Sequence, residues 1–193
     1  MMFRYIIIGM DKRVRKTIAA IYNAFGECLK EGSYNSIAVE DILQKAKVSR
    51  STFYAHFKTK DDVLDSLLRN IFHHVFSHSL QEEKSHDFSK ASVLDYKHLF
   101  THILYHLRDE GELVRAILSS GCRERFLTEM RHELEPLMTR VLREGALASK
   151  EVPEPLRIAS ALDSFISVVD YWFFASGDES PEAITDYFFA LND

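Results

Sequence analysis

The chain has 193 residues, 46% of them apolar and 27% charged, so it is long enough to bury a sizeable core. A net charge of −5 argues against a general binder of polyanions, and only two cysteines exclude a disulfide framework and favour a reducing, cytoplasmic location. No apolar run approaches the length that spans a membrane. Segment 1–9 is apolar, short and without a cleavage pattern, so we interpret it as an N-terminal extension and regard Met10 as an alternative start to Met1.

The first two predicted helices lie close to the N-terminus. Apolar residues recur at helical spacing over 12–31, and Gly32 is a typical helix end. A second, short helix is predicted over 39–46. Because Ala38 precedes it without a hydroxyl group, Ser36 is the candidate cap.

A three-residue break at 47–49 separates the second helix from a third one, predicted over 50–56. The last residue of the break is a Ser, which is a good N-cap. Thr59 and Asp62 have the spacing of a capping box, and they open a fourth helix from residue 60 to about residue 80. Two helices joined by three residues have the spacing of a helix-turn-helix.

The rest of the chain has only helical patterns. Residues 81–92 are polar and are predicted to form a linker. Further helices are expected over 94–108, 112–119, 123–144, 156–175 and 181–191, with Pro136 expected to kink the third of these. No strand pattern is present in the sequence. The chain is therefore predicted to be all-α with about nine helices, in a three-helix domain at 10–59 and a helical body at 60–193.

Charge is divided unevenly between these parts. Residues 10–76 hold 11 Lys and Arg against 8 Asp and Glu, a balance of +3, whereas residues 77–193 hold 12 against 21, a balance of −9. A basic front and an acidic rear are typical of a nucleic-acid module on a body that does not contact nucleic acid. The alternative is that these charges form ordinary solvated faces.

The third helix has two different sides. At 100° per residue, Phe53 and Phe57 fall on one side, whereas Ser51, Thr52 and Ala55 fall on the other. The two rings would anchor the helix to its neighbours, and the outward face would be small and rich in hydroxyl groups. A helix with such a face can approach another object closely, and the DNA major groove is wide enough to admit one.

The segment VEDILQKAKVSRSTFYAHFKTKDDVLDSLL, residues 39–68, resembles the DNA-binding signature of the tetracycline-repressor (TetR/AcrR) family of transcriptional regulators. The agreement lies at Ile42, Ala46, Val48, Ser49, Thr52, Tyr54, His56, Phe57 and Lys60. The family usually has Gly in the turn, where this chain has Lys47, so Lys47 either keeps a negative φ or adopts the left-handed conformation at a cost.

The resemblance implies that the third helix enters the major groove of double-stranded DNA. Base edges would lie nearest Arg50, Ser51 and Thr52, and phosphates would be held by Tyr54, His56 and Lys60. Physical reasoning adds Lys47 in the turn and the basic cluster at 12–16 as phosphate candidates. The alternative for that cluster is a solvated helix start, and the alternative for Tyr54 is ordinary packing.

The implied protein is not an enzyme and needs no cofactor. It would be a ligand-responsive repressor that binds a palindromic operator as a homodimer. The dimer surface is expected in the two most apolar helices of the body, at Phe165, Ile166, Val169, Trp172, Phe173, Ile184 and Phe188. The alternative is that these residues complete the core of one chain. Candidate liners of an effector cavity are Phe100, Leu104, Phe126, Met130, Phe165 and Tyr171.

Two other functions compete with this one. His98, His102 and His106 share a helix face at four-residue spacing, which would suit a metal-binding helical protein or a metal-dependent enzyme. The plainer interpretation is a solvated polar face. A helical interaction module whose helix-turn-helix does not bind DNA is the other alternative.

Overall fold

The computed structural model describes residues 11–83, 93–147, 151–176 and 178–193. Within these ranges the chain forms nine α-helices and no strand, which confirms the all-α prediction. The alternative start at Met10 lies outside these ranges, as do residues 84–92 of the predicted linker. None of the helices among the described residues is long and apolar enough to cross a bilayer.

The chain divides into two compact units. The N-terminal unit comprises residues up to His74 together with Glu112–Phe126, and the C-terminal unit comprises Val75–Gly111 and Leu127–Asp193. The domain boundary predicted between residues 59 and 60 stays a prediction, whereas these compact units divide inside two helices. Those helices, α4 (Lys60–Glu83) and α7 (Arg123–Arg143), each contribute residues to both units.

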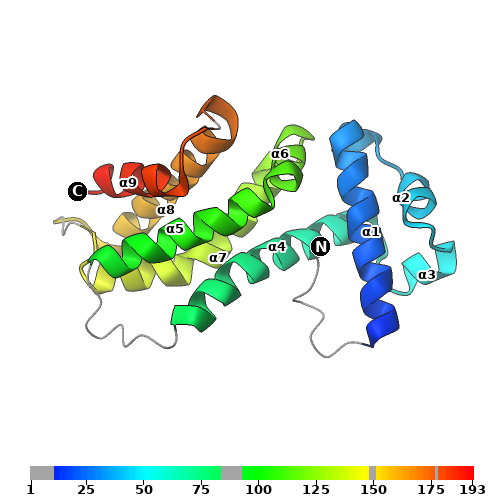
Figure 1. Ribbon diagram of the computed structural model, residues 1–193, viewed down its shortest axis with the longest axis horizontal. Coiled ribbons are helices and arrows are strands. Elements are labelled where there is room, and N and C mark those ends of the chain that lie inside the picture. Colours follow the sequence, from blue (N-terminus) through cyan, green and yellow to red (C-terminus); the bar gives the residue numbers. More distant parts are fainter. Residues whose placement is uncertain (1–10, 84–92, 148–150, 177) are drawn as a thin grey trace. The chain divides into compact units, whose positions relative to one another are not determined.

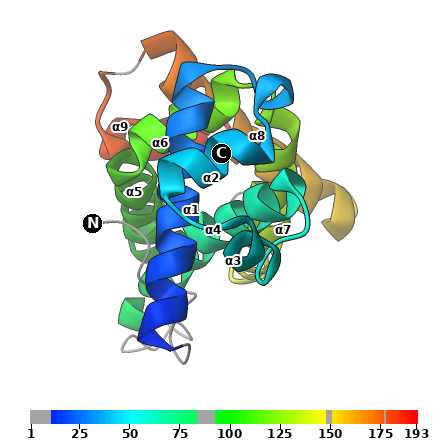
Figure 2. The same ribbon diagram turned by 90° about the vertical axis from the view of Figure 1, so that its right-hand side faces the viewer.

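The N-terminal unit is built around α1 (Lys12–Glu31). A 3₁₀ turn, η1 (Tyr34–Ser36), leads to α2 (Val39–Ala46) and α3 (Arg50–Tyr54), and α2 packs beside α1 (Figure 1 and Figure 2). The first half of α4 and α6 (Gly111–Ser119) complete the unit. The bounds of α1 and α2 agree with those predicted.

Predicted capping interactions define where α3 and α4 begin. The Ser49 hydroxyl accepts a hydrogen bond of 3.1 Å from the Thr52 amide. The Asp62 amide donates to the Thr59 hydroxyl at 3.1 Å, and the Thr59 amide donates to the Asp62 carboxylate at 2.9 Å. This reciprocal pair is the capping box expected from the spacing, and it satisfies amides that the first turn of a helix leaves unpaired.

The cap predicted for α2 is wrong. The Ser36 hydroxyl donates to the Ser33 carbonyl at 2.7 Å and does not reach the helix start. Instead, the Asp41 carboxylate accepts a 2.8 Å hydrogen bond from the Ala38 amide. Half of a capping box therefore suffices here, because an acidic side chain in the first turn also complements the helix dipole.

The aromatic anchor of α3 lies where the sequence placed it. Phe53 is fully buried, Phe57 is 6% exposed, and their ring centroids lie 5.9 Å apart. The Tyr22 ring of α1 lies 6.2 Å from that of Phe57. The helix ends at Tyr54, two residues earlier than predicted, because the Phe53 carbonyl accepts from the amides of both His56 and Phe57 and tightens the last turn.

The C-terminal unit combines α5 (Val93–Asp109), most of α7, α8 (Glu154–Tyr171) and α9 (Pro181–Ala190). Pro136 lies inside α7 without ending it. The helix predicted over 156–175 widens into a π-helix, η3 (Trp172–Ser176), in its last part. The α9 helix lies along α5 (Figure 1). The core is aromatic, with the Phe100 ring centroid 4.8–5.9 Å from the rings of Phe165, Phe188 and Phe189.

Candidate nucleic-acid interface

The outward face of α3 is small and polar. Ser51 is exposed, Thr52 is half-buried, and Tyr54 is 49% exposed, whereas Phe53 between them is fully buried. The hydroxyls of Ser51 and Thr52 lie 2.9 and 2.7 Å from the Ser49 hydroxyl. Each hydroxyl has one donor hydrogen and two acceptor lone pairs, so this cluster retains capacity for further hydrogen bonds.

The turn before α3 holds Lys47 in the left-handed conformation, with φ 54° and ψ 41°. It is the one residue other than Gly with a positive φ in the described part of the chain. The Lys47 amide donates to the Leu43 carbonyl and so closes α2. Of the two conformations considered for Lys47, the chain therefore adopts the strained one, and its exposed ammonium projects from the turn.

Arg50 is held by a neighbour on α2. Its guanidinium forms an ion pair with the Glu40 carboxylate, and both side chains are more than half exposed. Exposed pairs of this kind contribute little stability. Arg50, which was predicted to read bases, is thus exposed at the surface. The Glu40 carboxylate competes with any acceptor on a partner for the Arg50 guanidinium.

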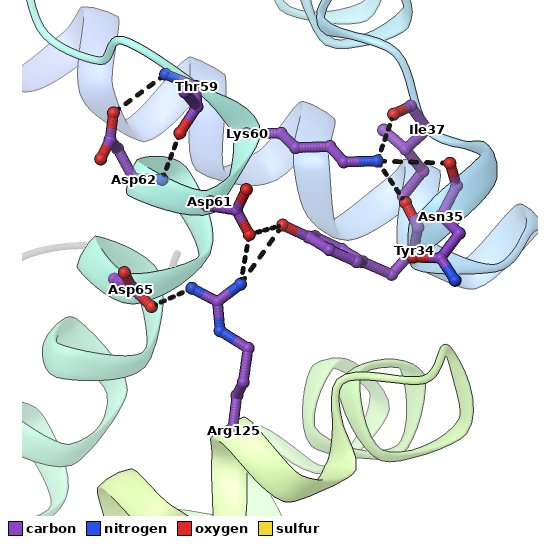
Figure 3. A network of polar contacts seen from close by, with 9 residues as sticks. All are labelled: Tyr34, Asn35, Ile37, Thr59, Lys60, Asp61, Asp62, Asp65 and Arg125. Carbon is purple, nitrogen blue, oxygen red and sulfur yellow. Dashed lines mark hydrogen bonds and ion pairs between the residues drawn. The ribbon is translucent and has the colours of Figure 1, made fainter.

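The Lys60 ammonium, a predicted phosphate contact, is directed at the loop before α2. It donates to the carbonyls of Tyr34 and Ile37 at 2.8 Å and of Asn35 at 3.3 Å, and it lies 4.5 Å from the Tyr34 ring centroid (Figure 3). The three N–H donors of the ammonium are thus matched by three carbonyl acceptors of the loop before α2. These contacts favour an internal role for Lys60 over the predicted phosphate contact.

The remaining phosphate candidates lie at the surface. His56 is half-buried, whereas Lys12, Arg13, Arg15 and Lys16 at the start of α1 are exposed. The Tyr54 ring packs edge-on against Phe53 at a centroid distance of 5.4 Å. About half of the Tyr54 side chain is thus packed and half is open to solvent, and its phosphate contact stays a prediction.

Sequence reasoning missed a polar network in the same unit. Arg125, from the first turn of α7, donates to the carboxylates of Asp61 and Asp65 on α4 and to the Tyr34 hydroxyl (Figure 3). No local pattern marks these residues, because Arg125 is separated from its α4 partners by 64 and 60 positions. Only the acidic spacing of four residues on α4 could have suggested a shared cation.

The residues predicted to line an effector cavity belong to both units, and most of them are packed in a core. Phe126 belongs to the N-terminal unit and packs on Phe72 at 5.0 Å, and Tyr171 is 43% exposed. The other four residues are fully buried core side chains, namely Phe100, Leu104, Met130 and Phe165. A cavity of about 340 Å³ lies elsewhere in the C-terminal unit, lined by Leu142, Leu147, Val152, Leu156, Arg157, Ser160, Ala161 and Asn192.

The predicted dimer residues are also core residues. All seven are at most 8% exposed within one chain, namely Phe165, Ile166, Val169, Trp172, Phe173, Ile184 and Phe188. Their own chain already covers these side chains, which favours the alternative of a completed core for them. The exposed apolar side chains of α8, η3 and α9 are different ones: Leu156, Tyr171, Phe174 and Tyr187, with Leu191 following α9.

The histidines of α5 form a pair and not a cluster. The Nε2 atoms of His102 and His106 lie 3.1 Å apart, whereas His98 is exposed. Among the described residues, no group of three or more His, Cys, Asp or Glu side chains has the geometry of a metal site.

The short α2, the three-residue turn and the anchored α3 define a helix-turn-helix protein. Residues 21–67 match the family described as "Bacterial regulatory proteins, tetR family". This part of the chain is therefore similar to the DNA-binding region of the TetR family of transcriptional regulators, the family that the sequence resembles.

Two relatives share this part of the chain. It is 30% identical to the uncharacterized HTH-type transcriptional regulator YxbF of Bacillus subtilis over 81 aligned residues. These residues make up 42% of this chain and 21% of YxbF. It is 36% identical over 52 aligned residues to DhaS of Lactococcus lactis, which is named as the HTH-type transcriptional activator of the dhaKLM operon. These residues make up 27% of this chain and 28% of DhaS. The matches thus span less than a third of either relative.

Similarity to solved structures extends over nearly the whole chain. A TetR transcriptional regulator from Streptococcus agalactiae is 28% identical with a TM-score of 0.72, covering 96% of this chain and 98% of the other. A TetR-family regulator from Syntrophomonas wolfei shares the fold at 17% identity, with a TM-score of 0.66 and coverage of 92% and 93%.

Proposed function

We propose that this regulator binds double-stranded DNA by placing α3 in the major groove. The observation that carries the proposal is the exposed hydroxyl face of Ser51 and Thr52, held outward by the buried Phe53 and Phe57. Side chains this small let the helix backbone approach the base pairs, and hydroxyls donate or accept according to the base that they meet. Arg50 would read guanine on leaving Glu40.

Phosphate contacts would come from Lys47, Tyr54 and His56 around α3. The exposed basic residues at the start of α1 add positive charge to the same unit. Contacts to phosphate position the helix and carry no sequence information of their own. We therefore expect substitutions at Lys47 to weaken binding to every duplex, and substitutions at Ser51 or Arg50 to change which duplex is preferred.

We also propose that the working form is a homodimer on a palindromic operator, because one short helix reads few base pairs. The exposed apolar stripe of α8 and α9 is the surface we assign to the second copy. Leu156 and Tyr171 fall on one side of α8, with the small exposed Ser160 and Ser167 between them. The Tyr171 ring lies 6.5 Å from that of Tyr187 on α9, which joins the two helices into one patch.

The regulator would respond to a small-molecule effector and act as a repressor. The effector site we propose is the 340 Å³ cavity of the C-terminal unit, whose size suits a small ligand and whose lining combines leucines with Arg157, Ser160 and Asn192. One relative is named as an activator, so the sign of regulation has to be measured directly.

Selection from a random duplex library tests the DNA-binding proposal. The wild-type chain should enrich a two-fold symmetric sequence, whereas Ser51→Tyr, which fills the outward face of α3, should enrich none. Arg143→Gln is the matched surface control, because Arg143 is an exposed residue of the C-terminal unit paired with Glu154. Equal, sequence-independent binding by all three proteins would contradict the proposal, and a wild-type chain that binds no duplex would favour an interaction module.

Sedimentation of Phe174→Asp tests the dimer surface. Phe174 is 52% exposed, so the substitution should leave the fold intact and convert a dimer into a monomer. Tyr105→Asp, at an exposed aromatic residue of α5, is the control and should remain dimeric. Monomeric wild-type protein at micromolar concentration, or a dimer unaffected by Phe174→Asp, would exclude this surface.

A further inference from the structure

Arg125 joins two helices of the N-terminal unit. Its guanidinium donates to Asp61, and at 2.5 Å to Asp65, one turn further along α4. The same group lies 3.4 Å from the Tyr34 hydroxyl, which itself donates to Asp61 (Figure 3). One cation therefore serves two carboxylates that face the same side of α4, and the planar guanidinium is the group suited to such a fork.

The network continues into the loop that precedes α2. The Tyr34 amide donates to the Ser120 carbonyl at 2.8 Å, beside the corner between α6 and α7. Lys60 binds the carbonyls of Tyr34, Asn35 and Ile37 from the first turn of α4. The loop is thus tied to α4 by Lys60 and Asp61, and to the start of α7 by Arg125 and the Ser120 carbonyl. Only one residue, Ala38, separates this loop from α2.

Arg125 stabilises the negative charges of the neighbouring carboxylates of Asp61 and Asp65. The hydrogen bond from Tyr34 and then that from Arg125 hold the pKa of Asp61 below its ordinary value. Burial and then the bond to Asp61 raise the pKa of Tyr34, so its hydroxyl keeps its proton. Without Arg125, Asp61 and Asp65 would be like charges one helical turn apart. Lys60 cannot replace the lost cation, because its ammonium is already bound to the loop carbonyls.

We infer that Arg125 is a positioning residue for the DNA-binding surface, an inference that rests on the proposed function. By linking the first turns of α4 and α7 to the loop before α2, it sets the orientation in which α2 and α3 are held. The same two helices, α4 and α7, continue into the C-terminal unit. Arg125 is therefore one of the side chains that fix these two helices against the loop before α2.

Exposure distinguishes this role from a contribution to bulk stability. The side chains of Arg125, Asp61 and Asp65 are 36%, 55% and 45% exposed, so their ion pairs are solvated and stabilise the folded chain only weakly. Removing Arg125 should leave the chain folded. The consequence to be measured is the placement of α2 and α3 and not the fraction of folded protein.

The test compares Arg125→Gln and Arg125→Lys with Arg143→Gln, another exposed arginine of α7 that binds one carboxylate, that of Glu154. Arg125→Gln should weaken binding to the duplex selected by the wild type by about tenfold, with binding to an unrelated duplex changed by less than about twofold. The affinity of Arg125→Lys for the selected duplex should lie between those of wild type and Arg125→Gln, because an ammonium keeps the positive charge and lacks the planar, forked donors of a guanidinium. Arg143→Gln should behave as wild type.

Amide hydrogen exchange without DNA supplies an independent measurement. Residues of α2 and α3 should exchange faster in Arg125→Gln than in wild type, and Arg143→Gln should show no such change. Unchanged exchange in α2 and α3, or equal losses of affinity for both duplexes, would overturn the inference. A wild-type chain that selects no duplex, together with faster exchange in Arg125→Gln, would refute the proposed function and leave the positioning role in place.

Discussion

The Lys60 ammonium donates a 2.8 Å hydrogen bond to the Ile37 carbonyl, so the first residue of α4 holds the last residue before the α2 cap. The same ammonium also binds the carbonyls of Tyr34 and Asn35. A residue whose position next to the recognition helix suggests a DNA contact is thus part of the scaffold that supports that helix. The distinction matters, because the two roles predict opposite results on substitution.

Lys60→Met is expected to lower the free energy of unfolding by about 2 kcal/mol, because hydrogen bonds to a charged group are lost and the loop carbonyls lose their partner. Denaturant titration measures this change, and the slope of DNA affinity against salt should stay the same. A phosphate contact would give the reverse pattern, with unchanged stability and a salt slope reduced by about one.

Lys47→Gly is expected to separate stability from DNA binding. Gly adopts the left-handed conformation of this turn without strain, so unfolding should require about 1 kcal/mol more. Loss of the ammonium should at the same time weaken binding to all duplexes. Lys47→Ala is the matched variant, since it loses the same charge and keeps the strain. A stability gain of equal size in both variants would show that the backbone conformation is not its source.

Glu40→Gln is expected to strengthen DNA binding. The substitution frees Arg50 from its ion pair and removes a negative charge beside the proposed interface. Both side chains are exposed, so stability should hardly change. Titration of the selected duplex should show several-fold tighter binding, and this gain should shrink when Arg50 is already replaced by Ala. A gain of the same size in the Arg50→Ala background would mean that Arg50 is not the residue released.

Glu110→Gln is expected to stabilise the protein at alkaline pH. Glu110 is 7% exposed, its Oε2 atom has no hydrogen-bond partner among the described residues, and burial raises its pKa from 4.5 to about 7. The native state thus holds a proton that the unfolded chain releases above pH 4.5, so stability declines as pH rises from about 4.5 to 7. The benefit of Glu110→Gln should be at most about 3 kcal/mol above pH 7 and should vanish below pH 4.5.

Thermal unfolding at pH 5 and pH 8 measures this difference. Glu135→Gln is the control, because Glu135 is an exposed carboxylate of α7. A variant that gains equally at both pH values would indicate that packing of the amide, and not the proton, is responsible.

Local sequence signals determined much of the N-terminal unit. The reciprocal bonds of Thr59 and Asp62 and the cap at Ser49 were predictable because each joins residues three apart, within reach in any helix start. The buried side of α3 was predictable because helical periodicity alone separates Phe53 and Phe57 from Ser51 and Thr52. The same signals carry the resemblance to the TetR family, and the match of residues 21–67 confirms that resemblance for this part of the chain.

The tertiary structure decided which partner each long or apolar side chain meets. Periodicity showed that Phe165 and Val169 must be buried, and it could not show whether their own chain or a second one covers them. Lys60 has a flexible stem that reaches either a phosphate or a carbonyl, and only the position of the 34–37 loop settles the choice. Arg125 meets Asp61 and Asp65 across 64 and 60 positions, because pairing at such a separation is fixed by how helices pack and leaves no periodic trace in the sequence.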